Sequence, residues 1–257
     1  MANMVKVARG NRKISVFATY EQMSDFAIKK WQEISQQAVA DRGFFAVALS
    51  GGKTLAGFYD KLSRSKKGLP WDKTHIFLVD ERFVPFDDDQ SNYRMIREHL
   101  LNSIEIPIEN IHPVPTRQIT PEISSKKYES YLVDFFKLKP GEMPVFDLVM
   151  LGIGEDGHTA SLFPWTSELM EKRRLAISVA LKRLKNRRIS LTLPVINNAR
   201  NVIFLVSGEN KAEVIKKILE EGDRMLPAAR VTPDRANLFF LMDEKAASLL
   251  SVSYKKN

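Results

Sequence analysis

The sequence predicts an α/β protein in which helices cover both faces of a mostly parallel sheet. Two observations predict this class. Short apolar runs alternate along the chain with segments of helical periodicity, as in layered α/β folds. Most of the runs are continuously apolar, which is typical of strands buried on both faces. No linker, repeat or low-complexity segment interrupts the pattern, so we expect one domain over residues 1–257.

The apolar runs are the expected strands. They are FFAVAL (44–49), HIFLVD (75–80), FDLVML (146–151), RISLTL (188–193), VIFLVS (202–207) and LFFLM (238–242). An earlier strand is expected to begin by about Ile14. Ligands of such folds bind at the carboxyl ends of the strands, so the residues that follow each run are the first candidates for a site.

Apolar residues spaced three or four apart mark the expected helices. These are expected over 20–40, over 55–62 after a Gly-Gly turn, from Asn92 through Leu100, from Pro121 to before Pro140, and over 214–219 before Gly222. Ser91-Asn92 and Thr120-Pro121 are typical helix starts, and glycine is a typical helix end.

The composition excludes several classes of protein. Apolar content of 44% and charged content of 27% are ordinary for a soluble globular chain. Cysteine is absent, which rules out disulfides, thiolate metal sites and cysteine nucleophiles. The first residues contain no apolar signal core, and no apolar run reaches membrane-spanning length. We therefore expect a cytoplasmic protein with no membrane partner.

The formal charge of +8 indicates either a nucleic-acid partner or an anionic substrate. Basic residues cluster over 61–67, 172–174 and 182–188, and none of these clusters is interleaved with aromatic residues. A solvated surface is the simplest interpretation of the first two. We therefore expect no nucleic-acid partner and favour a small anionic ligand.

The segment ALSGGKT at the end of the first listed strand indicates an anion site. It lacks the first glycine of a Walker loop, because Val47 stands there within the strand. A strand, a Ser50-Gly51-Gly52 turn and a helix start remain. Free backbone N–H groups and the helix dipole can still hold an anion there. Lys53 and Thr54 add a cation and a hydroxyl.

A second strand end carries Asp80, Glu81 and Arg82. Charged groups at the end of an apolar strand are costly unless they are paired or used. A structural ion-pair cluster is one interpretation. The other, which we favour, is that Arg82 faces an anion or oxyanion while an acid orients a base.

The third strand end, LGIGEDGHTASLFP, contains a G-x-G-x-x-G pattern, but Pro164 follows too soon for the long helix of a dinucleotide site. It places Asp156 and His158 two residues apart in a glycine-rich loop. His158 is the candidate general base, and His75, His99 and His112 are interpreted as structural or surface residues. No spacing suggests a metal site, and no G-x-S-x-G elbow is present.

These segments together resemble the 6-phosphogluconolactonase family. The resemblance is carried by LSGGKT, by VDERFVP with SNY, by DLVMLGIGEDGHTASLFP, and by RRISLTLPVINNARNVIFLVSGENKAEVI with LPAARVTP. It implies a Rossmann-like sandwich that uses no cofactor or metal and takes a phosphosugar lactone. Lys53 and Leu55 stand where the family's first loop has Ser and Pro. We expect a monomer or a weak homo-oligomer.

The resemblance also implies roles for individual residues. His158 would activate water against the lactone carbonyl, with Asp156 holding it, Arg82 stabilising the oxyanion and Glu81 and Asn92 supporting the pocket. The substrate phosphate would be bound by Ser50, Gly51, Gly52, Lys53, Thr54, Arg188 and Lys211.

Other functions compete with this one. The glucosamine-6-phosphate deaminase family has a sequence similar to DGHIAFNEP where this chain has DGHTASLFP. The acidic residue that follows the histidine loop in that family is therefore missing here. A sugar-phosphate-sensing regulator would need a helix-turn-helix before the first strand, and the start near Ile14 leaves no room for one. Hydrolysis of 6-phosphogluconolactone is the favoured function, and deaminase-like isomerisation is the alternative.

Overall fold

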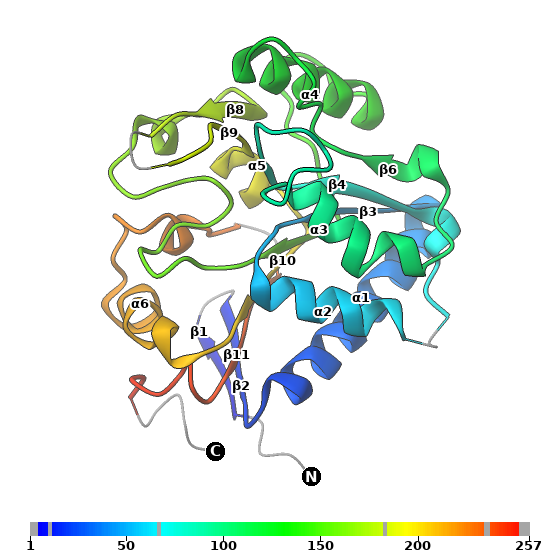
Figure 1. Cartoon of the computed structure of the whole chain (residues 1–257). Coiled ribbons are helices and arrows are strands. Elements are labelled where there is room, and N and C mark those ends of the chain that lie inside the picture. The colour runs from blue at the N-terminus through cyan, green and yellow to red at the C-terminus, as the bar shows by residue number, and fades with distance from the viewer. Residues whose placement is uncertain (1–4, 10–11, 66–67, 182–183, 234–236, 252–257) are drawn as a thin grey trace.

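The computed structural model describes residues 5–9, 12–65, 68–181, 184–233 and 237–251. Within these residues, eight strands form one sheet in the order β1-β2-β11-β10-β7-β3-β4-β6 (Figure 1). Its strands are β1 (Val5–Arg9), β2 (Arg12–Phe17), β3 (Phe45–Leu49), β4 (Thr74–Leu78), β6 (Ile111–His112), β7 (Leu148–Leu151), β10 (Asn201–Val206) and β11 (Asn237–Asp243). β1 is antiparallel to β2, and the other pairs are parallel.

A smaller antiparallel sheet has three strands in the described chain, in the order β5-β9-β8. They are β5 (Asp80–Arg82), β8 (Ala176–Val179) and β9 (Arg188–Leu191). The helices are α1 (Tyr20–Arg42), α2 (Lys53–Ser63), α3 (Asn92–His99), α4 (Pro121–Phe136), α5 (Leu193–Asn197) and α6 (Ala212–Lys216). A π-helical turn, Lys217–Glu221, extends α6 up to Gly222. The predicted class and the expected helices are confirmed.

The path of the chain puts helices on both faces of the larger sheet. From β2 it runs through α1, α2 and α3 toward one edge, and then returns through α4, α5 and α6 toward the other. Because such crossovers are right-handed, the first three helices cover one face and the last three the other (Figure 1). The direction reverses between β3 and β7, which lie side by side. This is the topological switch point, where folds of this class bind ligands.

Two expected strands are corrected by the structure. The run 75–80 is not one strand, because β4 ends at Leu78 and Asp80 begins β5 in the smaller sheet. Val79 joins the two sheets: its N–H donates to Leu49 O at 2.9 Å, and its carbonyl accepts from Leu191 N at 2.8 Å. Of the run 188–193, only Arg188–Leu191 is a strand: it is β9, which pairs antiparallel with β5 and β8 in the smaller sheet, and Leu193 already begins α5.

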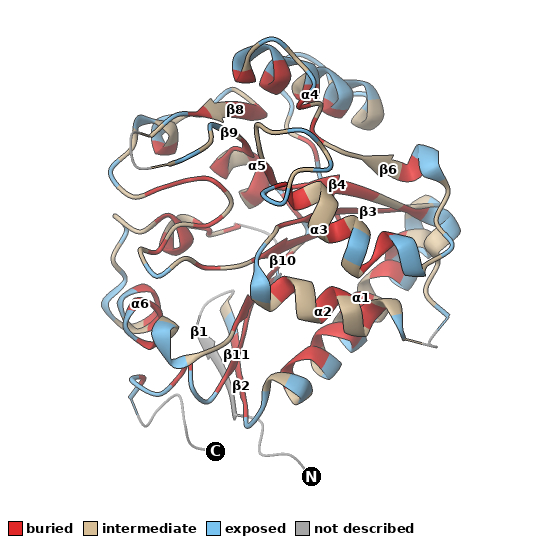
Figure 2. Ribbon diagram, in the orientation of Figure 1, coloured by how far each residue is buried: buried red, intermediate tan, exposed pale blue. Residues whose placement is uncertain are grey.

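Figure 2 shows buried residues along α1, α2 and the strands of the larger sheet. Aromatic side chains are among those that pack α1 and α2 against this sheet. Trp31 of α1 is fully buried, and its ring centroid lies 5.4 Å from Phe45 of β3, 6.4 Å from Phe58 of α2 and 6.0 Å from Trp71. Truncating a side chain this deeply packed typically costs about 3–5 kcal/mol. The start of α2, which borders the site, is thus fixed by the core.

Ion pairs neutralise part of each basic cluster. Lys61 binds Glu21 and Asp25, Arg174 binds Glu129, and Arg187 binds Glu122. Lys66, Lys67, Lys182 and Arg183 of these clusters lie outside the described residues. No helix in the described chain is both long enough and apolar enough to span a membrane.

A pair of histidines packs at the β6 edge of the sheet. His112 stacks on Phe77 at 4.2 Å between ring centroids, and its Nε2 lies 3.2 Å from His75 Nδ1. Burial, and then the charge of His75, lower the pKa of His112 to about 4, and burial lowers the pKa of His75. Both rings are therefore held neutral in the fold.

This pair predicts a pH dependence of stability. Between the ordinary histidine pKa of 6.5 and the folded value of about 4, His112 is protonated in the unfolded chain and neutral in the folded protein. The contribution of His112 to the free energy of unfolding is therefore fully present above pH 6.5. It is lost as the pH drops, by at most about 3 kcal/mol. We expect His112→Phe, which keeps a flat ring against Phe77, to lose that part of the pH dependence in urea titrations at pH 7, 5 and 4.

Ile123→Phe is the control, because it adds a ring at an exposed position of α4 and removes no titratable group. Its pH dependence should follow the wild type. An unchanged slope in His112→Phe would show that His112 is not held neutral by the fold.

Candidate functional site

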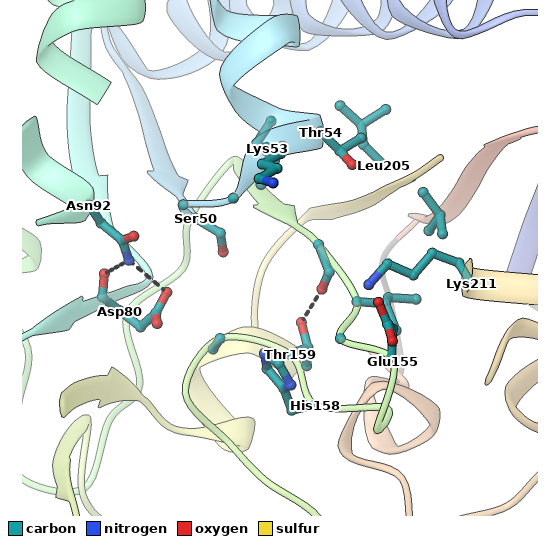
Figure 3. Close-up of a pocket in the computed structure, with 18 of the residues that line it drawn as sticks. Ser50, Lys53, Thr54, Asp80, Asn92, Glu155, His158, Thr159, Leu205 and Lys211 are labelled. Carbon is teal, nitrogen blue, oxygen red and sulfur yellow. Dashed lines mark hydrogen bonds between the residues drawn. The ribbon is translucent and has the colours of Figure 1, made fainter. Parts of the chain in front are cut away.

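A cavity of about 510 Å³ opens at the carboxyl ends of β3, β7 and β10, at the switch point of the sheet (Figure 3). Four walls line it: the turn after β3, the β5–β9 edge with α3, the loop after β7, and the segment after β10. Its lining includes ten of the twelve residues predicted from the sequence: Ser50, Gly51, Gly52, Lys53, Thr54, Arg82, Asn92, His158, Arg188 and Lys211. Lysines and arginines outnumber carboxylates in this lining, which suits an anion.

The first wall is the turn from β3 into α2. Gly52 caps the helix with a φ of +117°, a conformation that side chains rarely adopt, and it brings no capping side chain. The N–H groups of the first helical turn are therefore available to an anion. Ser50 is 4% exposed, and its Oγ is buried without a hydrogen-bond partner among the described residues. The Ser50 residue lines the cavity at this turn.

The second wall is a network around Asp80, whose side chain is almost fully buried. Its Oδ2 accepts from Ser161 Oγ at 2.5 Å, and Asn92 Nδ2 donates to its carbonyl at 2.9 Å. Asn92 Oδ1 in turn accepts from Arg82 Nη1 at 2.7 Å. Asp80 thus holds the Asn92 amide, and the amide in turn holds the Arg82 guanidinium. Both Asn92 and Arg82 line the cavity.

Glu81 does not line the cavity, unlike most of the residues predicted for the site. It is fully buried and absent from the cavity lining. Its carboxylate accepts from the backbone N–H groups of Arg82, Asn92 and Tyr93 at 2.7–2.8 Å, and from Ser91 Oγ at 3.1 Å. Burial raises the pKa of Glu81 to about 7, and the three N–H donors oppose that shift. Glu81 therefore anchors the start of α3 to β5 and does not face a ligand.

The third wall carries the histidine. His158 Nδ1 lies 2.5 Å from Asp156 Oδ1, and both side chains are about one-third exposed. The carboxylate holds the proton on Nδ1, which leaves Nε2 as the acceptor. Asp156 itself does not line the cavity. The Phe163 ring packs against the imidazole at 4.7 Å between centroids, which fixes the plane of the His158 ring.

Two glycines leave the space that these side chains occupy. A Cβ on Gly154 would lie 2.0 Å from His158 Nδ1 and 2.7 Å from Asp156 Oδ1. A Cβ on Gly51 would lie 1.9 Å from Asn92 Oδ1. The glycine pattern after β7 therefore serves the His–Asp pair and not a dinucleotide. Thr159 Oγ1 donates to Gly152 O at 2.9 Å and closes the loop (Figure 3).

The fourth wall contains residues that the sequence analysis missed. Ser207, Asn210 and Glu155 line the cavity beside the predicted Lys211. Asn210 Nδ2 donates to Glu155 Oε1 at 2.6 Å and so links the β10 segment to the histidine loop. The position of Ser207 at the end of an expected strand was the available signal. Among the described residues, no group of three histidine, aspartate or glutamate side chains is placed to hold a metal ion.

Comparisons with known proteins give the relatives of this chain. A family model described as "Glucosamine-6-phosphate isomerases/6-phosphogluconolactonase" matches residues 18–240. A 6-phosphogluconolactonase from Synechocystis sp. is 43% identical over 215 residues, 83% of this chain and 88% of that protein. One from Rattus norvegicus is 35% identical, covering 95% of this chain and 96% of that protein. The structure of a 6-phosphogluconolactonase from Trypanosoma brucei matches with a TM-score of 0.82 at 32% identity, covering 93% and 98% of the two chains.

The contact at Gly154 gives a test of the His–Asp geometry. Gly154→Ala is expected to push the imidazole off Asp156, because the new methyl group takes its place. The ring should then lose its fixed Nδ1–H tautomer, which long-range ¹H–¹⁵N spectra of the imidazole report. Gly68→Ala, at a glycine with open space around it, is the control and should leave the spectrum unchanged. An unaltered His158 tautomer in Gly154→Ala would contradict the described packing.

Proposed function

Because the chain belongs to the family of glucosamine-6-phosphate isomerases and 6-phosphogluconolactonases, we propose that it is a 6-phosphogluconolactonase. The reaction is hydrolysis of 6-phospho-D-glucono-1,5-lactone to 6-phosphogluconate, a step of the oxidative pentose phosphate pathway. The observation that carries the proposal is the Asp156–His158 pair in a cavity rich in cationic side chains. A general base and an anion-binding site are the two parts that hydrolysis of a phosphorylated lactone requires.

The chemistry follows from the histidine. Nε2 of His158 takes a proton from water as the water oxygen bonds to the lactone carbonyl carbon. The tetrahedral intermediate then breaks its bond to the ring oxygen, and the imidazolium returns the proton to that oxygen. The acid product loses its own proton to solvent. A lactone is an activated ester, so the step needs no nucleophilic side chain. A positioned base contributes roughly 10²–10⁴-fold to the rate.

Charge stabilisation is the second contribution. The Arg82 guanidinium, held by Asn92 and by the Gln90 carbonyl, is available to the oxyanion that forms on water attack. One such donor is worth roughly 10²–10³-fold. The start of α2, with Ser50 and Thr54, and the ammonium groups of Lys53 and Lys211 are available to the phosphate.

One packing contact favours hydrolysis over the alternative, aldose–ketose isomerisation with deamination. Phe163 occupies the place of the acid that follows the histidine loop in the deaminase pattern. Its ring lies against the imidazole of His158, 4.7 Å from it. An apolar ring cannot supply the additional proton transfer that ring-opened amino-sugar chemistry requires.

The direct test is hydrolysis of freshly prepared lactones, followed by acid release. We expect rapid hydrolysis of 6-phosphogluconolactone and a kcat/KM lower by roughly 10²-fold or more for unphosphorylated gluconolactone. Each lost hydrogen bond to a charged group is worth about 1.5–3 kcal/mol, and the phosphate makes several. Equal kcat/KM for the two lactones would contradict the proposal.

The role of His158 has its own test. His158→Ala should lower kcat by roughly 10²–10⁴-fold with little change in KM, because proton transfer belongs to the transition state. Asp156→Asn should also slow the reaction, since it removes the carboxylate that fixes the tautomer. A normally melting His158→Ala protein with the wild-type rate would exclude His158 as the base.

A further inference from the structure

Two arginines of the cavity face each other across the smaller sheet. Arg82 of β5 and Arg188 of β9 are directly paired in the antiparallel register. Side chains of such a pair lie on the same face of a sheet, a few ångströms apart, and both of these line the cavity. Like charges placed in this way repel each other, so this arrangement needs a compensating reason.

The protein itself compensates the pair only in part. Burial lowers the pKa of Arg188, the charge of Arg82 adds to this shift, and Asp80 and Glu81 oppose it. The Nε atoms of Arg82 and Arg188 are both buried and have no hydrogen-bond partner within the described residues. Both residues line the cavity, and two adjacent guanidinium groups are suited to a planar anion that can accept from both.

The Phe163 ring links the arginine pair to the histidine. The Arg188 guanidinium lies 5.8 Å from the centroid of the Phe163 ring, and the same ring packs on His158. Arg82 is tied to Asn92, which lies beside Asp80 on one side of the cavity. Figure 3 shows Thr54 and Lys211 on the other side, with Ser50 and His158 between. The cavity therefore has two cationic ends.

We propose that Arg82 and Arg188 form one subsite, which binds the lactone carbonyl oxygen and then the product carboxylate, and that the phosphate binds only at the end formed by α2 and Lys211. This inference rests on the proposed function and refines it. Sequence resemblance alone separates the two arginines, with Arg82 at the oxyanion and Arg188 at the phosphate. The cross-strand register brings them to the same group.

The chemistry of the substrate fits two cationic ends. Its phosphate is at C6 and its carbonyl at C1, at opposite ends of the sugar. Negative charge grows at C1 during the reaction, from a neutral carbonyl to an oxyanion and then a carboxylate. A pair of guanidinium groups at C1 therefore gains more from the transition state and the product than from the substrate.

The experiment compares two ligands that differ only at C1. 6-Phosphogluconate carries both a carboxylate and a phosphate, whereas glucitol 6-phosphate carries the phosphate alone. Their dissociation constants are measured by calorimetry on the full chain. In the wild type we expect 6-phosphogluconate to bind at least roughly tenfold more tightly, as for one hydrogen-bonded charge pair. Arg188→Gln should abolish this preference while leaving the affinity for glucitol 6-phosphate nearly unchanged.

The matched control is Arg187→Gln. It removes the same charge one residue away, where the side chain binds Glu122 of α4 instead of facing the cavity. It should retain the wild-type preference. Lys211→Gln should weaken both ligands by a similar factor, because both carry the phosphate. Thermal melting checks that each variant is folded, and Arg188→Lys replaces Arg188→Gln if the latter is not.

An Arg188→Gln protein that loses affinity for both ligands equally would place Arg188 at the phosphate and overturn the inference. The outcome is separate from the proposed function. Lactone hydrolysis by the wild type tests the function, whereas the ratio of the two affinities tests which end of the ligand Arg188 contacts.

Discussion

The pairing of β3 with β7 is the contact on which the rest of the site depends. These strands run parallel and adjacent, yet the chain leaves them toward opposite faces of the sheet. Their ends therefore cannot be bridged by one connection, and a crevice remains between the Ser-Gly-Gly turn and the histidine loop. Ser50 N donates to Met150 O at 3.2 Å, which fixes the spacing of the two turns at the bottom of this crevice. A helix start and a histidine are thus brought together by sheet topology.

The walls around that crevice are assembled by close approach. Two glycines allow this close approach. The Asn92 side chain takes the space of a Cβ at Gly51, and the His158 ring takes that space at Gly154. Asp80 then connects the parts, because it binds Ser161 from the histidine loop and Asn92 from α3. The resulting network is buried and largely satisfied, which holds its geometry with little freedom. Ser50, Arg82 and Arg188 line the cavity, and each keeps one buried polar atom without a hydrogen-bond partner among the described residues.

Much of the fold was predictable because burial dictates composition. Continuously apolar runs located β3, β7, β10 and β11, and helical periodicity located the larger helices. The same signal could not show that β9 pairs in a second sheet, because a buried strand has the same apolar composition in either sheet. The site was predictable to the extent that strand ends carry function, which indicated Ser50, Arg82 and His158. The sequence did not show that Glu81 points away from the cavity, because adjacent residues of a strand point to opposite faces and the sequence does not say which face meets the cavity.

The peptide of Val79 has a mechanical consequence. Its N–H belongs to the ladder of the larger sheet and its carbonyl to that of the smaller one, so a single residue joins the two. Asp80, Glu81 and Arg82 follow at once, without an intervening loop. The smaller sheet therefore continues the larger one through a single residue. The strand that carries Arg82 cannot be displaced without also moving the end of β4, because only Val79 lies between them.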